Sequence, residues 1–298
     1  MLEKLSTFIE NKTAQEGLNS TVIPFVKLFK SSDKTPVLNT VYEPSLFIIA
    51  QGAKIVMLGN NTIEYDRSSY LISTMHLPVS GKIIEAQPHK PFLSVQVTFD
   101  MELIFELLGQ RIQKPINPLQ TTLAISSYHV RDQLLDAVIR LVELIQTPDD
   151  IEILAPLYHK EILYMLLMND KHAEEFRQLA CLEGNAYKIS QAISMMRANL
   201  FEPLSVLELA NSVNMSISTF HKHFKTMIAM SPMQYRKVQR LQEAKRLMVS
   251  ENMDVSGAAF YVGYESVSQF SREYSKYFGL SPSQDMKILR QRLNTKDL

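Results

Sequence analysis

The stretch LSVLELANSVNMSISTFHKHFK, residues 204–225, decides how the C-terminal part of this chain folds. Its pattern predicts a capped short helix, a turn and a second, amphipathic helix, which together make a helix-turn-helix unit. The stretch DVSGAAFYVGYESVSQFSREYSKYF, residues 254–278, repeats the plan with a turn at 263–266. We call the second helix of each unit its reading helix. Two units in series predict a protein that reads DNA with two helices.

A third predicted helix joins the two units. It runs from Pro232 to Ser250, and proline is favoured in the first turn of a helix. At about 1.5 Å per residue, a helix of this length spans roughly 28 Å. One turn of DNA is about 34 Å, so both reading helices could enter successive major grooves on one face of the duplex.

The C-terminal part resembles the AraC/XylS transcription regulators from about Ile189 to Arg290. Such a long run of matching pattern is far more specific than a single helix-turn-helix, which occurs by chance. The matching segments are 231–235 (SPMQY), 240–247 (RLQEAKRL), 262–266 (VGYES), 269–272 (QFSR) and 278–283 (FGLSPS).

Helical spacing separates the inward and outward faces of the reading helices. Phe220, Phe224 and Met227 recur on one face of the first, and Phe270, Tyr274 and Tyr277 on one face of the second. In the first helix, alignment with the family places three outward residues where base edges are usually met: Ser218, His221 and Lys222. In the second, the residues expected to face the groove are Val267, Ser268, Ser271 and Arg272.

Among these, Arg272 can bind a guanine edge with two hydrogen bonds, and Val267 can contact a thymine methyl group. We expect Thr219, Lys225 and Lys276 to contact the DNA backbone. The alternative for each residue is a solvated position on a helix, without any contact to a base. The sequence also departs from the resemblance at Asp285 and Met286, where the family more often has an aromatic and a basic residue. The departure predicts weaker backbone contacts by the second unit.

Charge is distributed unevenly along a chain whose net charge is zero. Residues 187–298 hold 15 Lys and Arg against 9 Asp and Glu, a net charge of +6, and residues 1–186 hold 16 against 22, a net charge of −6. A basic C-terminal part on an acidic N-terminal part suits a polyanionic partner. The alternative is a chance asymmetry.

Cysteine content and hydropathy predict a cytoplasmic protein, and the resemblance to the AraC/XylS regulators implies a bacterial one. Cys181 is the only cysteine, so no disulfide can form within the chain. The first residues lack the apolar core of a signal peptide, and the longest apolar run, 162–168, is too short to cross a bilayer. We therefore expect no membrane association.

The N-terminal half has the pattern of an antiparallel β domain. Residues 54–58 and 62–65, joined by a turn at 59–61, predict a hairpin, and residues 93–99 alternate so that Leu93, Val95, Val97 and Phe99 share one face. Burying that face needs a second sheet, so we expect a small barrel or sandwich. Helices are expected at 101–108, capped by Asp100, and at 128–147, capped by Ser127.

This half resembles the cupin-like sensor domain of one AraC subgroup. The matching segments are 47–54, 65–66 with 70–71, 77–81, 156–158 and 161–167. The combined fold prediction is α+β: a cupin-like barrel or sandwich followed by helices at 1–180, and an all-α domain with tandem helix-turn-helix units at 181–298. The resemblance implies regulation but identifies no effector.

The histidine pattern argues against a metal enzyme. A metal-binding cupin needs convergent imidazoles, whereas His76 and His89 are isolated, so surface or loop histidines are the simpler interpretation. Phosphate-binding and hydrolase motifs are absent from the sequence. We therefore expect no catalytic residue, no metal and no cofactor.

The predicted helix at 128–147 carries an apolar stripe of helical period, formed by Val130, Leu134, Val138, Leu141 and Ile145. Two such helices could pair across a twofold axis and form a homodimer. Packing of the helix on its own sheet explains the stripe equally well, and both alternatives stay open.

Together these patterns predict a sequence-specific transcriptional regulator, either an activator or a repressor. Its expected partners are double-stranded DNA, a small effector bound in the cupin-like domain, RNA polymerase and a second copy of the chain. The alternatives are a cupin metalloenzyme fused to a DNA-binding domain and a constitutive DNA binder without an effector.

Overall fold

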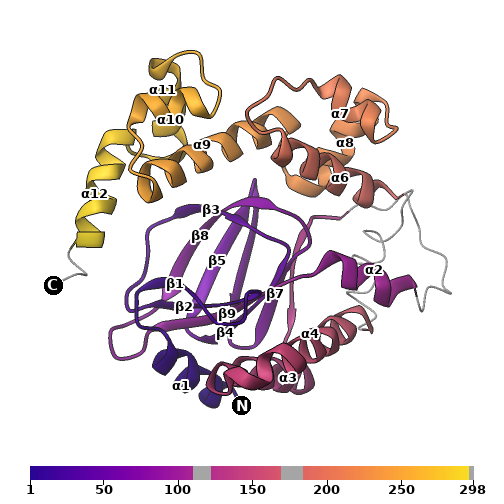
Figure 1. The fold of residues 1–298 in the computed structure, drawn as a ribbon, viewed down its shortest axis with the longest axis vertical. Helices are drawn as coiled ribbons and strands as arrows, with labels where there is room; N and C mark the ends of the chain where they lie inside the picture. Colours follow the sequence, from indigo (N-terminus) through magenta and orange to yellow (C-terminus); the bar gives the residue numbers. More distant parts are fainter. Residues whose placement is uncertain (110–121, 169–183, 295–298) are drawn as a thin grey trace.

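The computed structural model describes residues 1–109, 122–168 and 184–294. An N-terminal sensor part of strands and helices is followed by a helical C-terminal part, as Figure 1 shows. Cys181 and the expected domain boundary at 180/181 lie outside the described residues. The expected order, a β domain first and helices last, is confirmed.

The strands form two antiparallel sheets. One sheet has the order β1-β2-β9-β4-β7-β10 and the other the order β3-β8-β5-β6. The strands are β1 (Gly17–Ser20), β2 (Val26–Ser31), β3 (Leu38–Tyr42), β4 (Ser45–Gln51), β5 (Ala53–Leu58), β6 (Asn61–Asp66), β7 (Ser69–Ser73), β8 (Leu77–Glu85), β9 (Phe92–Thr98) and β10 (Ile125–His129).

The two sequence signals for strands are confirmed. β5 and β6 pair as a hairpin with Lys54 opposite Tyr65, and Gly59 allows the tight turn with a φ of +58°. Leu93, Val95, Val97 and Phe99 are all buried. These apolar faces drive the sheets together, because the buried surface needs a second layer.

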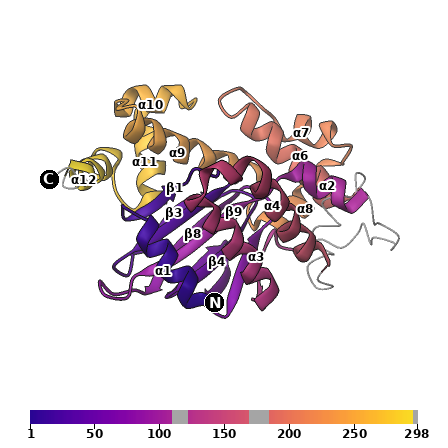
Figure 2. The same cartoon turned by 60° about the horizontal axis from the view of Figure 1, so that its bottom comes forward.

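Helices cover the sensor on the side away from the C-terminal part. These are α1 (Leu2–Lys12), α3 (Asp132–Glu143) and α4 (Ile151–Met168), which lie together in Figures 1 and 2. α1 contacts β2, β4 and β9, and α3 packs against α4. Two short 3-10 turns, Leu144–Gln146 and Pro148–Asp150, connect α3 to α4. α2 (Met101–Gly109) begins as expected, since the Asp100 carboxylate accepts from the amides of Glu102 and Leu103.

The helix expected from Tyr128 starts four residues later. Residues 125–129 form β10 instead, with Tyr128 opposite Tyr70 on β7, so Ser127 caps no helix. As an edge strand, these residues form backbone hydrogen bonds with β7. A helix beginning at Tyr128 would lose those hydrogen bonds. The prediction of the start at Tyr128 was wrong, although the helical period from Leu134 onward is correct.

The apolar stripe of α3 packs inside the chain. Leu134, Val138 and Leu141 are at most 5% exposed, while Val130 and Ile145 are partly buried against the same core. Packing on its own domain therefore explains the stripe. Pairing of two copies of the chain stays a prediction and needs other residues of this surface.

The C-terminal part consists of seven helices within the described residues. They are α6 (Asn185–Ala198), α7 (Val206–Ser212), α8 (Ile217–Ile228), α9 (Pro232–Ser250), α10 (Val255–Tyr261), α11 (Val267–Phe278) and α12 (Pro282–Asn294). The buried residues of α6, α7 and α8 continue the core of the sensor, whereas α10, α11 and α12 surround a smaller core with the end of α9. α9 crosses the barrel on the side of β3 and β8.

Candidate nucleic-acid interface

The first helix-turn-helix unit is formed by α7 and α8. Ser205 and Glu208 form a capping box at the start of α7, and the Ser216 hydroxyl accepts from the Thr219 amide at the start of α8. Phe220 and Phe224 are fully buried, so the predicted inward face of α8 is confirmed. The exposed side chains of α8 include Ser218, Lys222 and Lys225.

The second unit, α10 and α11, repeats this arrangement. Asp254 caps α10 through the Gly257 amide, and Ser266 caps α11. The turn between the helices contains Gly263 at φ +82°, a value that favours glycine. Phe270 and Tyr274 are fully buried. Both predicted units are therefore present, with α8 and α11 as the reading helices.

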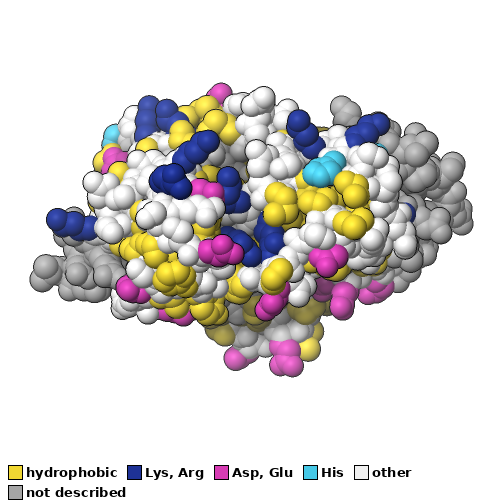
Figure 3. All heavy atoms as spheres, turned by 90° about the horizontal axis from the view of Figure 1, so that it is seen from above, with side chains coloured by type: hydrophobic (Ala, Val, Ile, Leu, Met, Phe, Trp, Pro, Cys, Tyr) yellow, Lys and Arg dark blue, Asp and Glu magenta, His cyan; other side chains and the backbone are white. Residues whose placement is uncertain are grey.

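The predicted DNA-contacting residues fall into two groups by exposure. Six are exposed: Ser218, Lys222, Lys225, Ser268, Arg272 and Lys276. Four are half-buried: Thr219, His221, Val267 and Ser271. Figure 3 shows Lys and Arg side chains over both helical units and in the hollow between them.

Some of these residues also have structural roles. The Thr219 hydroxyl accepts from Ser216, which ties it to the cap of α8. Val267 packs against the core of the second unit. Arg272 has no ion pair within the described part of the chain, so its guanidinium is available to a ligand.

The connecting helix α9 runs over the predicted 19 residues, from Pro232 to Ser250. Ser231 and Gln234 form a capping box at its start. Its expected bounds are confirmed, since the helix starts at the proline and continues over the predicted length.

Two arginines of α9 donate hydrogen bonds to backbone carbonyls outside that helix. Arg236 donates to the backbone carbonyls of Leu200, Glu202 and Leu204, in the connection before α7. Arg240 donates to the Leu200 and Phe201 carbonyls and also to the carbonyl of Gly263, in the turn of the second unit. The Arg240 side chain thus bonds both to the segment that leads into the first unit and to the turn of the second unit.

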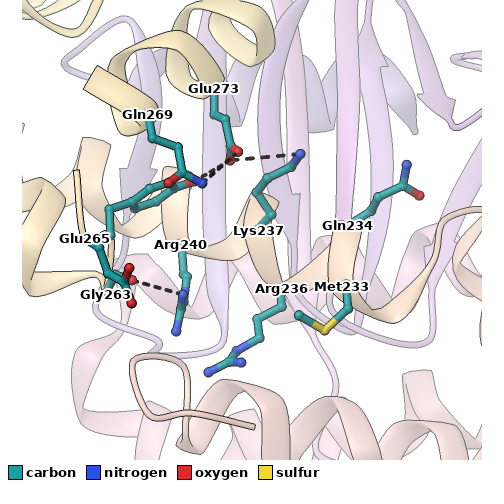
Figure 4. Close-up of a pocket in the computed structure, with 10 residues that line it drawn as sticks. Met233, Gln234, Arg236, Lys237, Arg240, Gly263, Glu265, Gln269 and Glu273 are labelled. Atoms are coloured by element: carbon teal, nitrogen blue, oxygen red, sulfur yellow. Dashed lines mark hydrogen bonds and ion pairs between the residues drawn. The ribbon is translucent and has the colours of Figure 1, made fainter. Parts of the chain in front are cut away.

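A polar pocket of about 470 Å³ lies between α9 and the second unit (Figure 4). Lys237 points toward Glu273 of α11, with 4.0 Å between Nζ and the carboxylate oxygen, and Glu273 also accepts from the Tyr264 hydroxyl. Sequence reasoning missed Lys237, Arg240 and Gln269 as residues of this region. Their positions on the outward faces of α9 and α11 were a signal for exposure but not for the pocket.

The departure at Asp285 and Met286 has a structural explanation. Both residues are buried, and the Asp285 carboxylate accepts from the Tyr274 hydroxyl and from Lys245 Nζ, each at 2.7 Å. The carboxylate therefore ties α12 to α11 and α9. Neither side chain is exposed to meet a phosphate, so we explain the departure by packing within the second unit.

The reading helices end against the sensor. The Ala124 amide donates to the Met227 carbonyl in α8, and the Asn39 side chain of β3 donates to the Tyr277 carbonyl in α11. Between these points, the Tyr235 hydroxyl of α9 donates to the His76 carbonyl. The sensor thus contacts both units and the helix that joins them.

The described residues contain no group of three or more His, Cys, Asp or Glu side chains arranged to hold a metal ion. His76 contacts Arg197, and His89 is exposed. No helix among the same residues is long and apolar enough to cross a membrane.

Two family patterns match the chain. The pattern described as the N-terminus of AraC-type transcriptional regulators matches residues 22–174, about half of the chain, and a helix-turn-helix domain matches residues 209–288. The chain belongs to the AraC-type transcriptional regulators. The helix-turn-helix match includes α8 and α11, the two reading helices of the structure.

Two relatives show how far the similarity extends. The lactose operon transcription activator of Staphylococcus xylosus is 22% identical over 239 residues, which is 77% of this chain and 81% of the relative. The regulator GbdR of Pseudomonas aeruginosa is 30% identical over 120 residues, or 40% of this chain. That match spans only 33% of the length of GbdR.

A solved structure has the same fold. ToxT from Vibrio cholerae O395 aligns over 89% of this chain and 98% of its own, with a TM-score of 0.60 and 15% identity. At this identity the likeness concerns the fold, which is that of a β sensor followed by tandem helix-turn-helix units.

Proposed function

We propose that the chain controls transcription by placing α8 and α11 in successive major grooves of one promoter. The observation that carries this proposal is the pair of capped reading helices, each with a buried aromatic face and an outward polar face, held at the two ends of α9. The proposed base contacts come from Ser218, His221 and Lys222 in α8 and from Val267, Ser268, Ser271 and Arg272 in α11. Thr219, Lys225 and Lys276 contact phosphates.

The proposal includes control by a small effector. It is supported by the contacts of the sensor with α8, α9 and α11, because a change in the sensor would alter how the two units are held. The name of the Staphylococcus relative describes an activator of a lactose operon, and we propose an activator here also. A catalytic activity is not part of the proposal.

The remaining partners are RNA polymerase and a second copy of the chain in the bacterial cytoplasm. A homodimer would join two pairs of units and raise the affinity for a repeated site. We divide the chain into a sensor at 1–180 and a DNA-binding domain at 181–298. The first unit shares its core with the sensor, which suits communication between the domains.

A salt titration of DNA binding tests this function. The C-terminal part has a net charge of +6, so binding to DNA should release several counterions. With about six phosphate contacts, affinity for a selected site should fall on the order of a thousandfold between 50 and 200 mM salt. An affinity that does not change with salt would exclude DNA binding of the proposed kind.

A further inference from the structure

A cavity of about 520 Å³ lies where the sensor meets the first helix-turn-helix unit. The sensor contributes Met75 and His76 from the segment between β7 and β8, and α2 contributes Met101 and Phe105. From the other side, α6 contributes Tyr187 and Ser194, and the end of α7 closes the lining. Sites for small molecules have volumes of about 300–1,000 Å³ and occur preferentially between domains.

The described residues that line this cavity carry no formal charge. It consists of methionine, aromatic and aliphatic side chains, with hydroxyl groups, one amide and the imidazole of His76 as its polar groups. Burial and the neighbouring Arg197 lower the pKa of His76 to about 4, so the imidazole is neutral at pH 7. Arg197, which contacts His76, lies outside the lining, so a charged ligand would lose its hydration without an opposite charge among the described lining residues, which is costly.

Four other pockets in the described part of the chain differ in this respect. The pocket over α9 has five charged side chains in its lining, among them Arg240 and Glu273, and the pocket between α3 and α4 has Arg140 and Glu161. Two smaller pockets beside α1 also contain Glu3. The junction cavity is therefore the one best suited to an uncharged molecule.

We propose that the junction cavity binds a neutral, mainly apolar small molecule with an aromatic ring and a hydrogen-bonding group. The ring fits a lining in which Phe105 and Tyr187 meet edge to face, with 5.9 Å between ring centroids. The hydrogen-bonding group fits the hydroxyls on α6, of which Ser194 is exposed.

Such a ligand would act on the first reading unit. It touches the sensor, α2, α6 and α7 together, and therefore stabilises the arrangement in which α6 and α7 lie against the sensor. Because α6 and α7 both pack on α8, the ligand changes how α8 is presented to DNA. This regulatory step rests on the proposed function, whereas the binding step does not.

A matched pair of fluorescent probes tests the binding step on the full chain. N-phenyl-1-naphthylamine is neutral and apolar, and 8-anilinonaphthalene-1-sulfonate has the same rings with an added negative charge. We expect the neutral probe to bind at one site per chain, and the anionic probe to bind at least tenfold more weakly. Absence of binding by the neutral probe, or equal affinities for the two probes, would overturn the proposal.

Variants of α6 locate the site. Ser194→Phe fills the cavity and Ser194→Asp adds a charge to it, whereas Ala198→Phe is the control, on an exposed residue of the same helix outside the lining. We expect each Ser194 variant to bind the neutral probe at least tenfold more weakly than the parent chain, and the control to bind it with unchanged affinity. Circular dichroism checks that all three variants fold. Should Ser194→Phe fail to fold, Ser194→Asp decides. Equal binding by the Ser194 and Ala198 variants would place the probe elsewhere.

The regulatory step has its own readout. The neutral probe should change the affinity of the parent chain for a selected DNA site. It should leave the DNA affinity of the Ser194→Asp variant unchanged. Binding of the probe without an effect on DNA affinity would retain the site but reject its regulatory role. Binding of the probe to a chain that binds no DNA would refute the proposed function and leave the site intact.

Discussion

Arg272 is an exposed guanidinium on α11, at a position where it can meet a base edge. We predict that Arg272→Ala costs roughly 1–3 kcal/mol of binding free energy at one base pair and relaxes the preference there, because a bidentate contact to guanine is lost. Lys225→Ala, at the last turn of α8, should weaken all DNA sequences alike. Affinities for a set of single-base variants of the site measure both effects, and a uniform loss in both mutants would contradict base readout by α11.

Asp285 is a buried carboxylate whose partners come from two other helices. We predict that Asp285→Ala lowers the free energy of unfolding by about 1–3 kcal/mol, since the buried Tyr274 hydroxyl loses its acceptor. Tyr274→Phe should cost less, because Lys245 still pairs with Asp285. Urea unfolding of the three proteins measures the difference, and an unchanged midpoint in Asp285→Ala would show that the carboxylate contributes nothing.

At the residue scale, the sequence predicts which face of a helix is buried better than it predicts the partners of individual side chains. The period of Phe220, Phe224 and Met227 places the core side of α8 correctly, and the outward residues follow from it. The buried role of Asp285 could not be predicted, because it depends on Tyr274 and Lys245 arriving from separate helices. The same holds for Arg240, whose backbone partners lie far along the chain.

α9 is the element that sets the distance and angle between the reading helices. We predict that Arg240→Met lowers affinity for a site with two half-sites by roughly tenfold, which corresponds to about 1.4 kcal/mol, because one link between the units is lost. Arg246→Met is the matched control on the same helix, since Arg246 is exposed and pairs only with Glu243 and Glu251 among the described residues. Fluorescence anisotropy measures both affinities, and equal losses in the two variants would argue against a role of Arg240 in coupling the units.

At the element scale, strong local signals gave correct bounds and weak ones did not. Pro232 and the helical pattern of the 19 residues that it begins predict the bounds of α9 correctly. The start of α3 was misplaced because residues 125–129 form an edge strand, which pairs with β7, a strand distant in sequence. The sequence also could not show what covers the apolar stripe of α3. A stripe of helical period fits an internal core and a dimer interface equally well.

At the scale of the whole molecule, the sensor and the DNA-binding part are packed as one body. The first unit continues the sensor core, and Asn39, Ala124 and His76 bond to α11, α8 and α9 in turn. The sequence predicted both parts but not these contacts, because nothing in local patterning records which surfaces of two domains meet. This packing makes the position of the two reading helices depend on the state of the sensor.

The central claim is that α8 and α11 read one face of DNA at a spacing set by α9. The most direct test selects a binding site from random DNA, inserts five base pairs between its two half-sites, and compares the affinities of the full chain for both duplexes. Since one turn is about 10–10.5 base pairs, the insertion moves the second half-site to the opposite face. We predict that affinity falls to that of a single half-site, and an unchanged affinity would contradict the account.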